Sequence, residues 1–144
     1  RDCGNQVVMQ FPSKAVNIGF ARTAVAMFAA QLDFTLEELD EIKIAVSEGV
    51  SNAVIHGYRE KEGLITITCT LEDNGLVVVI KDEGRGVPDV VQAFVPAFTT
   101  EPEERMGLGL VFIREYMDES DMESMVGKGT SLIMRKWPQM RQEA

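Results

Sequence analysis

The apolar positions in the first part of the chain predict one strand and one amphipathic helix. Residues 6–11 (QVVMQF) alternate weakly between polar and apolar side chains and end at a proline, which favours a strand. Residues 14–32 carry apolar side chains at helical spacing, so that one face of a helix can be buried. A strand followed by a helix is therefore expected over residues 6–32.

The pattern also predicts a second, longer helix with clear signals at both ends. Thr35, followed three residues later by Glu38, matches a capping box and predicts a helix that begins at Leu36. Gly57 is a natural C-terminal stop for this helix. Its expected apolar arc consists of Leu39, Ile42, Val46, Gly49, Val50 and Ala53.

The pattern then changes to the period of β-strands. Residues 64–71 and 75–82 are rich in β-branched side chains, and the Asn74-Gly75 pair between them is a strong hairpin signal. Two neighbouring antiparallel strands are therefore expected here.

The last third of the chain predicts a long loop, a helix and a strand pair. Residues 93–106 hold two prolines, two threonines and several charges without a clear period, which is typical of a functional or disordered loop. A helix is expected over residues 107–117, and two strands over residues 121–127 and 130–137.

The predicted order is β-α-α-β-β-loop-α-β-β. This order favours an α/β fold, a two-layer sandwich with a mixed, mostly antiparallel sheet and its helices on one face. No repeat, linker or second domain is visible, so residues 1–144 are expected to form a single domain.

Composition and charge narrow the classes of partner. No apolar run approaches the roughly 20 residues that span a membrane. The net charge is −9 and no basic cluster is present, which argues against direct binding of nucleic acid. The acidic surface suits a basic protein partner, and it is explained equally well by solubility alone. Cys3 and Cys69 form neither a metal spacing nor a disulfide framework, so a cytoplasmic protein is expected.

Three polar residues on the second predicted helix, Glu48, Asn52 and His56, are spaced four and four. Because a helix advances about 100° per residue, their side chains fall within an arc of roughly 80° beside the apolar face. Glu48 could accept a proton, Asn52 could be an oxygen ligand to Mg²⁺, and His56 could donate to a phosphate. Taken alone, the spacing is explained better by a polar helix edge without a ligand.

Three glycine-containing motifs follow. Residues 82–86 (DEGRG) end a strand, where the backbone can turn close to a planar ligand and Asp82 could accept from an exocyclic amine. Residues 107–110 (GLGL) open a helix whose free N–H groups could hold phosphate. Residues 127–131 (GKGTS) place Thr130 where its hydroxyl or a bound water could reach the same ligand. A strand-ending turn, a hinge and a hairpin turn are the simpler explanations of each motif alone.

The order of the motifs resembles that of the family that includes gyrase, heat-shock chaperone, histidine kinase and mismatch-repair ATPases. Glu-x-x-x-Asn, Asp-x-Gly-x-Gly, Gly-x-Gly-Leu and Gly-x-Gly-Thr follow one another over nearly the whole chain. The resemblance implies the Bergerat ATP-binding fold, with ATP and Mg²⁺ as cofactors and residues 93–109 as a lid over the nucleotide.

The resemblance also implies roles for individual residues. Glu48 would accept the proton of the incoming hydroxyl, and Asn52 would be the Mg²⁺ ligand. Arg105 either stabilises charge on the γ-phosphoryl group or is a solvated lid residue. The implied ATP-binding residues are Asn52, His56, Asp82, Gly84, Gly86, Val87, Thr99, Thr100, Gly107, Leu108, Gly109, Leu110 and Thr130.

Within this family the chain strongly resembles the small bacterial serine kinases that act as anti-sigma factors, in the segments VSEGVSNAVIHGY, DEGRGVPD, AFTTEPEERMGLGL and GKGTSLIM. These are the sporulation anti-sigma-F family (stage II sporulation protein AB) and the general-stress anti-sigma-B kinases. The resemblance implies a homodimer that binds a sigma factor and phosphorylates a serine of an anti-anti-sigma protein. A non-catalytic ATP-binding module and a detached ATP domain of a sensor kinase are the alternatives. Arg22 matches a partner-contacting position of the anti-sigma-F family, and is otherwise a plain surface arginine.

Two residues depart from the family pattern. Gly49 stands where alanine is common, and a glycine within a helix costs up to about 1 kcal/mol relative to alanine. Glu101 stands where lysine is common, which places a negative charge near the expected phosphate contacts of the lid.

Overall fold

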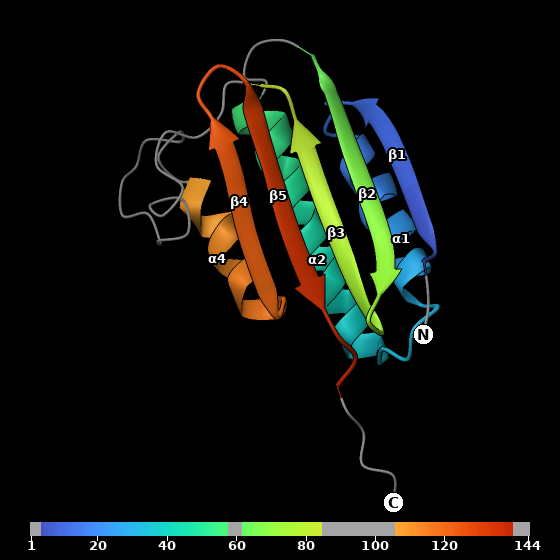
Figure 1. Ribbon diagram of the computed structural model, residues 1–144. Coiled ribbons are helices and arrows are strands. Elements are labelled where there is room, and N and C mark those ends of the chain that lie inside the picture. Colours follow the sequence, from blue (N-terminus) through green and yellow to red (C-terminus); the bar gives the residue numbers. More distant parts are fainter. Residues whose placement is uncertain (1–3, 58–61, 85–105, 140–144) are drawn as a thin grey trace, which may run out of the picture.

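The computed structural model describes residues 4–57, 62–84 and 106–139, which form a five-stranded sheet and a layer of helices (Figure 1). In chain order the elements are β1 (Gln6–Pro12), α1 (Asn17–Ala29), α2 (Leu36–Asn52), the π-helical turn η1 (Ala53–Gly57), β2 (Leu64–Glu72), β3 (Gly75–Asp82), α4 (Met106–Tyr116), β4 (Glu119–Met125) and β5 (Gly129–Lys136). The predicted order of strands and helices is confirmed within these residues.

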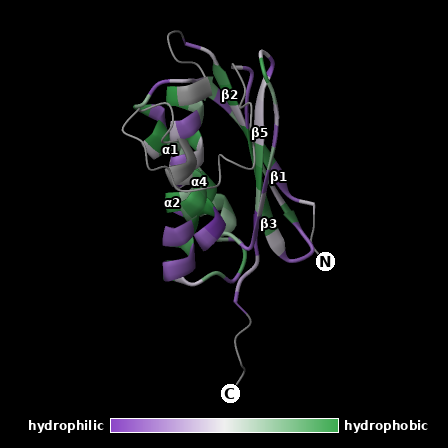
Figure 2. Ribbon diagram, turned by 90° about the vertical axis from the view of Figure 1, so that its left-hand side faces the viewer, coloured by the Kyte–Doolittle hydropathy of each residue, from purple (hydrophilic) through white to green (hydrophobic). Residues whose placement is uncertain are grey.

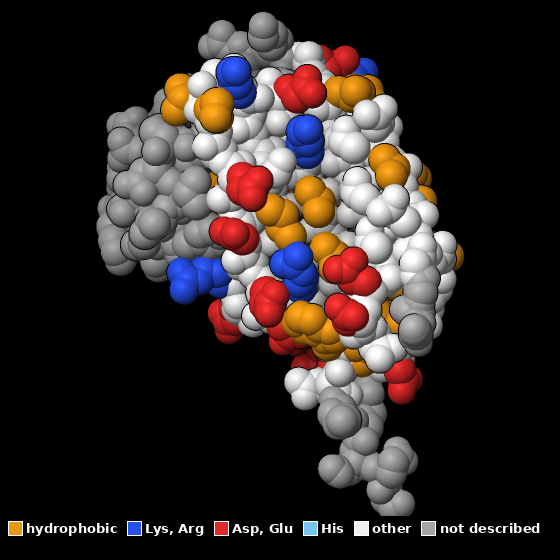
Figure 3. Space-filling view, in the orientation of Figure 1, with side chains coloured by type: hydrophobic (Ala, Val, Ile, Leu, Met, Phe, Trp, Pro, Cys, Tyr) orange, Lys and Arg blue, Asp and Glu red, His pale blue; other side chains and the backbone are white. Residues whose placement is uncertain are grey.

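The sheet has the strand order β1-β2-β3-β5-β4. The helices lie against one of its faces (Figures 1 and 2), and charged, polar and hydrophobic side chains are mixed on the other face (Figure 3). The predicted two-layer α/β sandwich with a mostly antiparallel sheet is therefore confirmed, and all pairings between the described strands are antiparallel. None of the described helices is long and apolar enough to cross a membrane.

The hydrophobic core lies between the two layers. Alternate side chains of the central strands, such as Ile67 and Val78, are fully buried against helical residues such as Val46 and Ile113. Side chains of a strand point alternately to the two faces, so one face of each central strand joins this core. Removing such apolar surface from water contributes about 25 cal/mol per Å² and is the main stabilising effect.

The β2–β3 hairpin is confirmed, although the turn lies one residue before the predicted Asn-Gly pair. Asp73 and Asn74 occupy the turn with φ of 55° and 63°, and Gly75 already pairs with Glu72. Asp and Asn tolerate the positive φ that such a turn requires at both positions. Gly75 is needed for a different reason, because a Cβ there would lie 2.5 Å from Nε1 of Trp137.

Helix α2 begins at the predicted residue because the capping box is complete. Thr35 Oγ1 accepts the Glu38 N–H at 3.0 Å, and Glu38 Oε1 accepts the Thr35 N–H at 2.8 Å. Two of the N–H groups that lack helical partners are satisfied in this way.

The predicted apolar arc of α2 packs onto the sheet at Gly49. A Cβ at Gly49 would lie 2.7 Å from Cδ1 of Ile80 and 3.0 Å from Cδ2 of Leu132. The absence of a side chain therefore allows the helix to approach β3 and β5 closely. Except for the half-buried Leu39, the whole predicted arc is buried.

The last turn of α2 changes to π-helical geometry from Ala53 to Gly57. A π-helical turn pairs residues five apart, so the regular period of the α-helix ends at Asn52. Glu48 and Asn52 therefore lie one α-helical turn apart, as predicted. His56 lies in the π-helical turn, where the α-helical period no longer applies. The helical segment ends at Gly57, as predicted.

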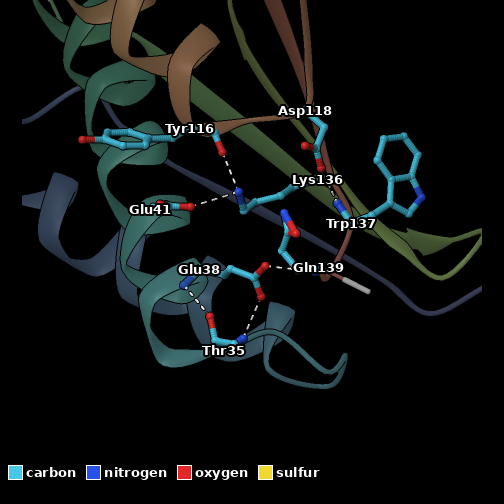
Figure 4. A network of polar contacts seen from close by, with 8 residues as sticks. All are labelled: Thr35, Glu38, Glu41, Tyr116, Asp118, Lys136, Trp137 and Gln139. Atoms are coloured by element: carbon cyan, nitrogen blue, oxygen red, sulfur yellow. Dashed lines mark hydrogen bonds and ion pairs between the residues drawn. The ribbon is translucent and has the colours of Figure 1, made fainter. Parts of the chain in front are cut away.

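Polar contacts fix the end of β5, and the residues after it, to α2 and α4 (Figure 4). Lys136 Nζ donates to the carbonyl oxygen of Tyr116 at 2.6 Å and to Glu41 Oε1 at 3.1 Å. The Gln139 N–H donates to Glu38 Oε2 at 2.9 Å, so the carboxylate of the capping box also holds the chain after β5. This network lies where α2 begins and α4 ends.

Candidate functional site

The polar residues of the sequence motifs gather at the opposite end of the sandwich from that network. The C-terminal end of α2 and the N-terminal end of α4 lie there, together with the end of β3 and the start of β5 (Figure 1). The turn η1 packs against both β3 and β5. Asp82 and Thr130 are direct partners in the β3–β5 register. Asp82 and Thr130 are thus brought together from two strands, and Asn52 is the last residue of α2, directly before the turn η1 that packs against these strands.

Asp82, the last residue of β3, is a buried carboxylate with 6% of its surface exposed. Its Oδ1 accepts the Gly84 N–H at 2.9 Å, and the backbone N–H of Thr130 also donates to the carboxyl group. Burial raises the pKa of Asp82, and the two backbone hydrogen bonds lower it by a smaller amount. A carboxylate has lone pairs beyond these two bonds, so the environment suits the predicted contact with an amino group.

A row of polar side chains crosses the sheet from Asp82 to Thr130 and Ser124. Ser124 pairs with Thr130 in the β4–β5 register, and their hydroxyl oxygens lie 2.9 Å apart. A groove of about 260 Å³ is lined by all three residues and by Gly129. This volume is below the roughly 300 to 1,000 Å³ of most ligand pockets.

Gly129 allows this row to form. Its φ is 121°, and a Cβ would overlap the backbone of Asp82 and Glu83. The second glycine of the GKGT motif, Gly129, therefore allows a close approach between β5 and the end of β3. The sequence interpretation missed Ser124, because a turn over residues 127–129 would place Val126 opposite Thr130. The turn lies over residues 126–128 instead, and this register places Ser124 opposite Thr130.

Asn52 has a side-chain group whose hydrogen bonding is unsatisfied within the described part of the chain. Its side-chain amide nitrogen is buried, and no hydrogen-bond partner for it exists among the described residues. A buried polar group without a partner is costly, so a ligand that pairs with it is favoured. When the amide nitrogen of Asn52 donates a hydrogen bond to a bound molecule, the amide oxygen is left to coordinate a metal ion. Mg²⁺ prefers oxygen ligands of this kind. Glu48, one turn earlier, is half-buried and near the same end of α2.

The N-terminal end of α4 contributes backbone groups. The helix begins at Met106, so Gly107, Leu108 and Gly109 fall in its first turn, where N–H groups lack helical partners and favour anions. Leu110 has its side chain in the hydrophobic core, so any contact of this residue with a nucleotide would come from its backbone.

Several predicted site residues lie outside the part of the chain that the structure describes. These are Gly86, Val87, Thr99, Thr100 and Arg105, together with most of the predicted lid over residues 93–109 and with Glu101. The side chain of His56 is also outside the description. Arg22 is exposed on α1 and does not line the groove.

Comparison with known proteins gives a match to a family model over most of the chain. Residues 11–136 match the model of the histidine kinase-like ATPase domain. An anti-sigma F factor of Clostridium acetobutylicum is 45% identical over 133 residues, covering 92% of this chain and 93% of that protein. Anti-sigma F factors of Thermoanaerobacter sp. (strain X514) and Geobacillus kaustophilus are 48% and 46% identical over 134 residues, with at least 92% of each chain covered.

Solved structures share the fold at lower identity. The RsbU and RsbW domains of a Mycobacterium tuberculosis protein superpose with a TM-score of 0.65 and 18% identity, over 92% of this chain and 32% of that chain. The mycobacterial sensor histidine kinase MprB superposes with a TM-score of 0.59 and 17% identity, over 95% of this chain and all of that chain. These structures share the fold, and the family model and the curated relatives show that the chain belongs to the histidine kinase-like ATPase domain family and, within it, to the anti-sigma F factors.

Proposed function

We propose that this chain binds ATP with Mg²⁺ at the end of the sandwich formed by Asn52, Asp82 and Thr130, and that it is a serine protein kinase and anti-sigma factor. The observations that support the nucleotide site are the buried carboxylate of Asp82 and the buried side-chain amide nitrogen of Asn52, for which the described residues offer no hydrogen-bond partner. A polar ligand at this end of the sandwich would satisfy the Asn52 amide nitrogen and use the remaining lone pairs of Asp82.

In this proposal, different described residues bind the base, the phosphates and the metal ion of the nucleotide. Asp82 accepts a hydrogen bond from the exocyclic amine of adenine, and Thr130 contacts the base directly or through water. The first turn of α4 supplies N–H groups and the positive end of a helix dipole to the phosphates. Asn52 would hold Mg²⁺, and the bound ion would neutralise negative charge on the phosphates.

The proposed reaction is transfer of the γ-phosphoryl group to a serine hydroxyl of a protein. Phosphoryl transfer depends on alignment and charge stabilisation more than on covalent help from the enzyme. Glu48, half-buried one turn before Asn52, accepts the hydroxyl proton as the bond between the serine oxygen and the γ-phosphorus forms and the bond from the γ-phosphorus to the β,γ-bridging oxygen breaks, which releases ADP. Arg105 would stabilise charge on the transferred group.

The partners of the proposed function come from the relatives named anti-sigma F factor. The chain would hold a sigma factor as a cytoplasmic homodimer in the control of sporulation and would phosphorylate an anti-anti-sigma protein. Its net charge of −9 is consistent with a basic surface on a partner. Arg22, exposed on α1, is the proposed partner contact.

Labelled ATP incubated with the chain and an anti-anti-sigma protein tests the kinase. We expect label on a serine of the partner, and a fall of about 100-fold or more in Glu48→Gln with little change in ATP affinity. Asp82→Asn should weaken ATP binding itself by about tenfold or more. The exposed variants Glu72→Gln and Asp40→Asn are matched controls and should behave as wild type.

The outcomes separate the two parts of the proposal. ATP binding without any labelling of the partner would favour a non-catalytic ATP-binding module that only shapes a sigma-binding surface. Unchanged ATP affinity in Asp82→Asn would show that the nucleotide assignment is wrong.

A further inference from the structure

The two edge strands of the sheet differ in how they are protected against pairing with another chain. β4 lies at one edge and carries the acidic side chains of Glu119, Asp121 and Glu123 (Figure 1). β1 lies at the other edge, and its seven residues include no charged side chain. Charged side chains on an edge strand oppose the addition of a further strand, and an uncharged edge permits it. β1 is therefore the edge at which a further strand can be added.

The pairing of β1 with β2 determines which backbone groups of β1 face outward. Before the strand begins, the Leu71 N–H donates to the carbonyl oxygen of Asn5, and after it ends the Ser13 N–H donates to that of Gly63. Both contacts continue the antiparallel register of β1 and β2, in which hydrogen-bonded residues alternate along each strand. The odd-numbered residues of β1 therefore pair with β2, and the N–H and C=O groups of the even-numbered residues face away from the sheet.

At the two ends of β1 the outward positions are already closed. The Gln6 N–H donates to Asn5 Oδ1 at 3.0 Å. Pro12 has no N–H group, and its carbonyl oxygen accepts from Asn17 Nδ2 at 3.0 Å. A strand added to this edge would therefore pair with the middle of β1.

The middle of β1 presents backbone donors and acceptors that complement themselves. The outward N–H and C=O groups of Val8 and Gln10 have no hydrogen-bond partner among the described residues. They lie symmetrically about Met9. A second β1, antiparallel and related by a two-fold axis between the Met9 residues, places Val8 opposite Gln10 of the second copy on both sides of the axis. Each such pair exchanges two hydrogen bonds, so every outward group of these residues is satisfied.

We infer that the chain forms a homodimer by antiparallel pairing of β1 with β1 of a second copy, which joins the two sheets into one. The register follows from the closed ends, because Gln6 would face Pro12 of the second copy, which has no N–H to offer. The partly buried Met9 residues meet at the axis and add apolar contact. The acidic β4 strands lie at the far edges of the joined sheet, which limits repulsion between two chains of net charge −9.

This inference rests on the homodimer of the proposed function and adds its contact surface. The interface is isologous, since the same strand is used by both copies. The proposed nucleotide site lies at α2, β3, β5 and α4 and does not include β1, so dimer formation and ATP binding can be measured separately.

Proline variants test the pairing without removing a hydrogen bond between β1 and β2. Val8→Pro removes an outward N–H and places its ring against the second copy, and proline is tolerated where the N–H of an edge strand faces solvent. We expect the dissociation constant of the dimer, measured on the whole chain by analytical ultracentrifugation, to rise at least about tenfold. Gln6→Pro is the matched control, because its N–H also faces outward but lies beyond the paired residues. Its dissociation constant should stay near the wild-type value.

Cysteine variants test the register independently of any effect of proline on β1. In a Cys3→Ser background, Met9→Cys places two thiols at the axis, where a Cα separation of about 4.5 Å permits a disulfide. We expect oxidised glutathione to link this variant into a covalent dimer. Val7→Cys is the control on the same face of β1, because its position lies opposite Phe11 of the second copy and far from the second thiol. Cys69 is buried and does not compete.

The contrary results separate this surface from the rest of the proposed function. A wild-type chain that stays monomeric would overturn the inference and leave the β1 edge to a strand of a different protein. A dimer unaffected by Val8→Pro, or equal disulfide formation in Met9→Cys and Val7→Cys, would overturn this surface and leave the homodimer in place. ATP binding is decided by calorimetry on the same proteins, and a chain that dimerises through β1 without binding ATP would overturn the nucleotide site alone.

Discussion

At the scale of single residues, Asp82 shows how backbone N–H groups hold a buried carboxylate in place. The carboxylate sits at the end of β3 with two backbone N–H donors, and burial outweighs their effect on its pKa. The type of side chain and its place before Gly84 were predictable from the DEGRG motif. Its burial was not, because that depends on β5 closing over the end of β3 at Gly129.

The raised pKa of Asp82 predicts a pH dependence with a defined sign. The folded chain binds the proton more tightly than the unfolded chain, so Asp82 destabilises the fold when ionised, and this penalty is relieved as pH falls through its folded pKa. As the pH falls, the free energy of unfolding of the wild type should therefore rise relative to that of Asp82→Asn, as measured by urea denaturation. ATP affinity should fall over the same pH range, because the protonated group is a poorer acceptor.

The exposed variant Asp40→Asn is the control for this measurement, since its side chain is 72% exposed. Its difference from wild type should show no gain of this kind on acidification. A movement in favour of Asp82→Asn as the pH falls would contradict the burial argument.

At the scale of elements, the sequence predicted the helix end that is determined by neighbouring residues, and it did not predict the turn that depends on tertiary contacts. The start of α2 at Leu36 was correct because the capping box of Thr35 and Glu38 is complete within four residues. The π-helical turn η1 was not predicted, because its sequence AVIHG carries no propensity signal that separates it from an α-helical end. Its contacts with β3 and β5 are tertiary, and they lie beside the proposed site.

The contact of α2 with the sheet predicts an energetic coupling between Gly49 and Ile80. Gly49→Ala gains helix propensity of about 1 kcal/mol, but its Cβ would meet Cδ1 of Ile80 at 2.7 Å in a dense core, where overpacking costs about 1 to 3 kcal/mol. We expect a net loss of stability in the single variant. Ile80→Val removes the atom that collides, so the double variant should be more stable than the two single effects predict, by about 1 kcal/mol.

Urea denaturation of the four proteins in this cycle measures the coupling. A cycle with Ile67→Val in place of Ile80→Val removes a similar group from a buried position that does not face Gly49, and should show additive effects. Additivity in the Ile80 cycle would mean that α2 relaxes away from the sheet without loss.

At the scale of the whole molecule, the fold separates two polar regions at opposite ends of the sandwich. Thr130 at the start of β5 belongs to the proposed nucleotide site, and Lys136 at its end belongs to the network that ties β5 to α2 and α4 (Figures 1 and 4). The order of predicted strands and helices was sufficient to predict the two layers. The network was not foreseen, because Lys136 and Glu41 are 95 residues apart and neither belongs to a motif.

Removal of the Lys136 ammonium group should therefore affect stability and leave the distant site intact. The Lys136 side chain is only 8% exposed, and Lys136→Met deprives the carbonyl of Tyr116 and the carboxylate of Glu41 of a charged donor. A lost hydrogen bond to a charged group costs about 1.5 to 3 kcal/mol, and because Glu41 remains 28% exposed we expect a loss near the lower end, measured by urea denaturation.

In Lys136→Met with Glu41→Leu no unpaired carboxylate remains, so stability should partly recover. ATP affinity should stay within about twofold of wild type in both, because Leu110 and Ile113 hold α4 in the core independently of Lys136. A large loss of ATP affinity with unchanged stability would show instead that the network at one end controls the position of α4 at the other.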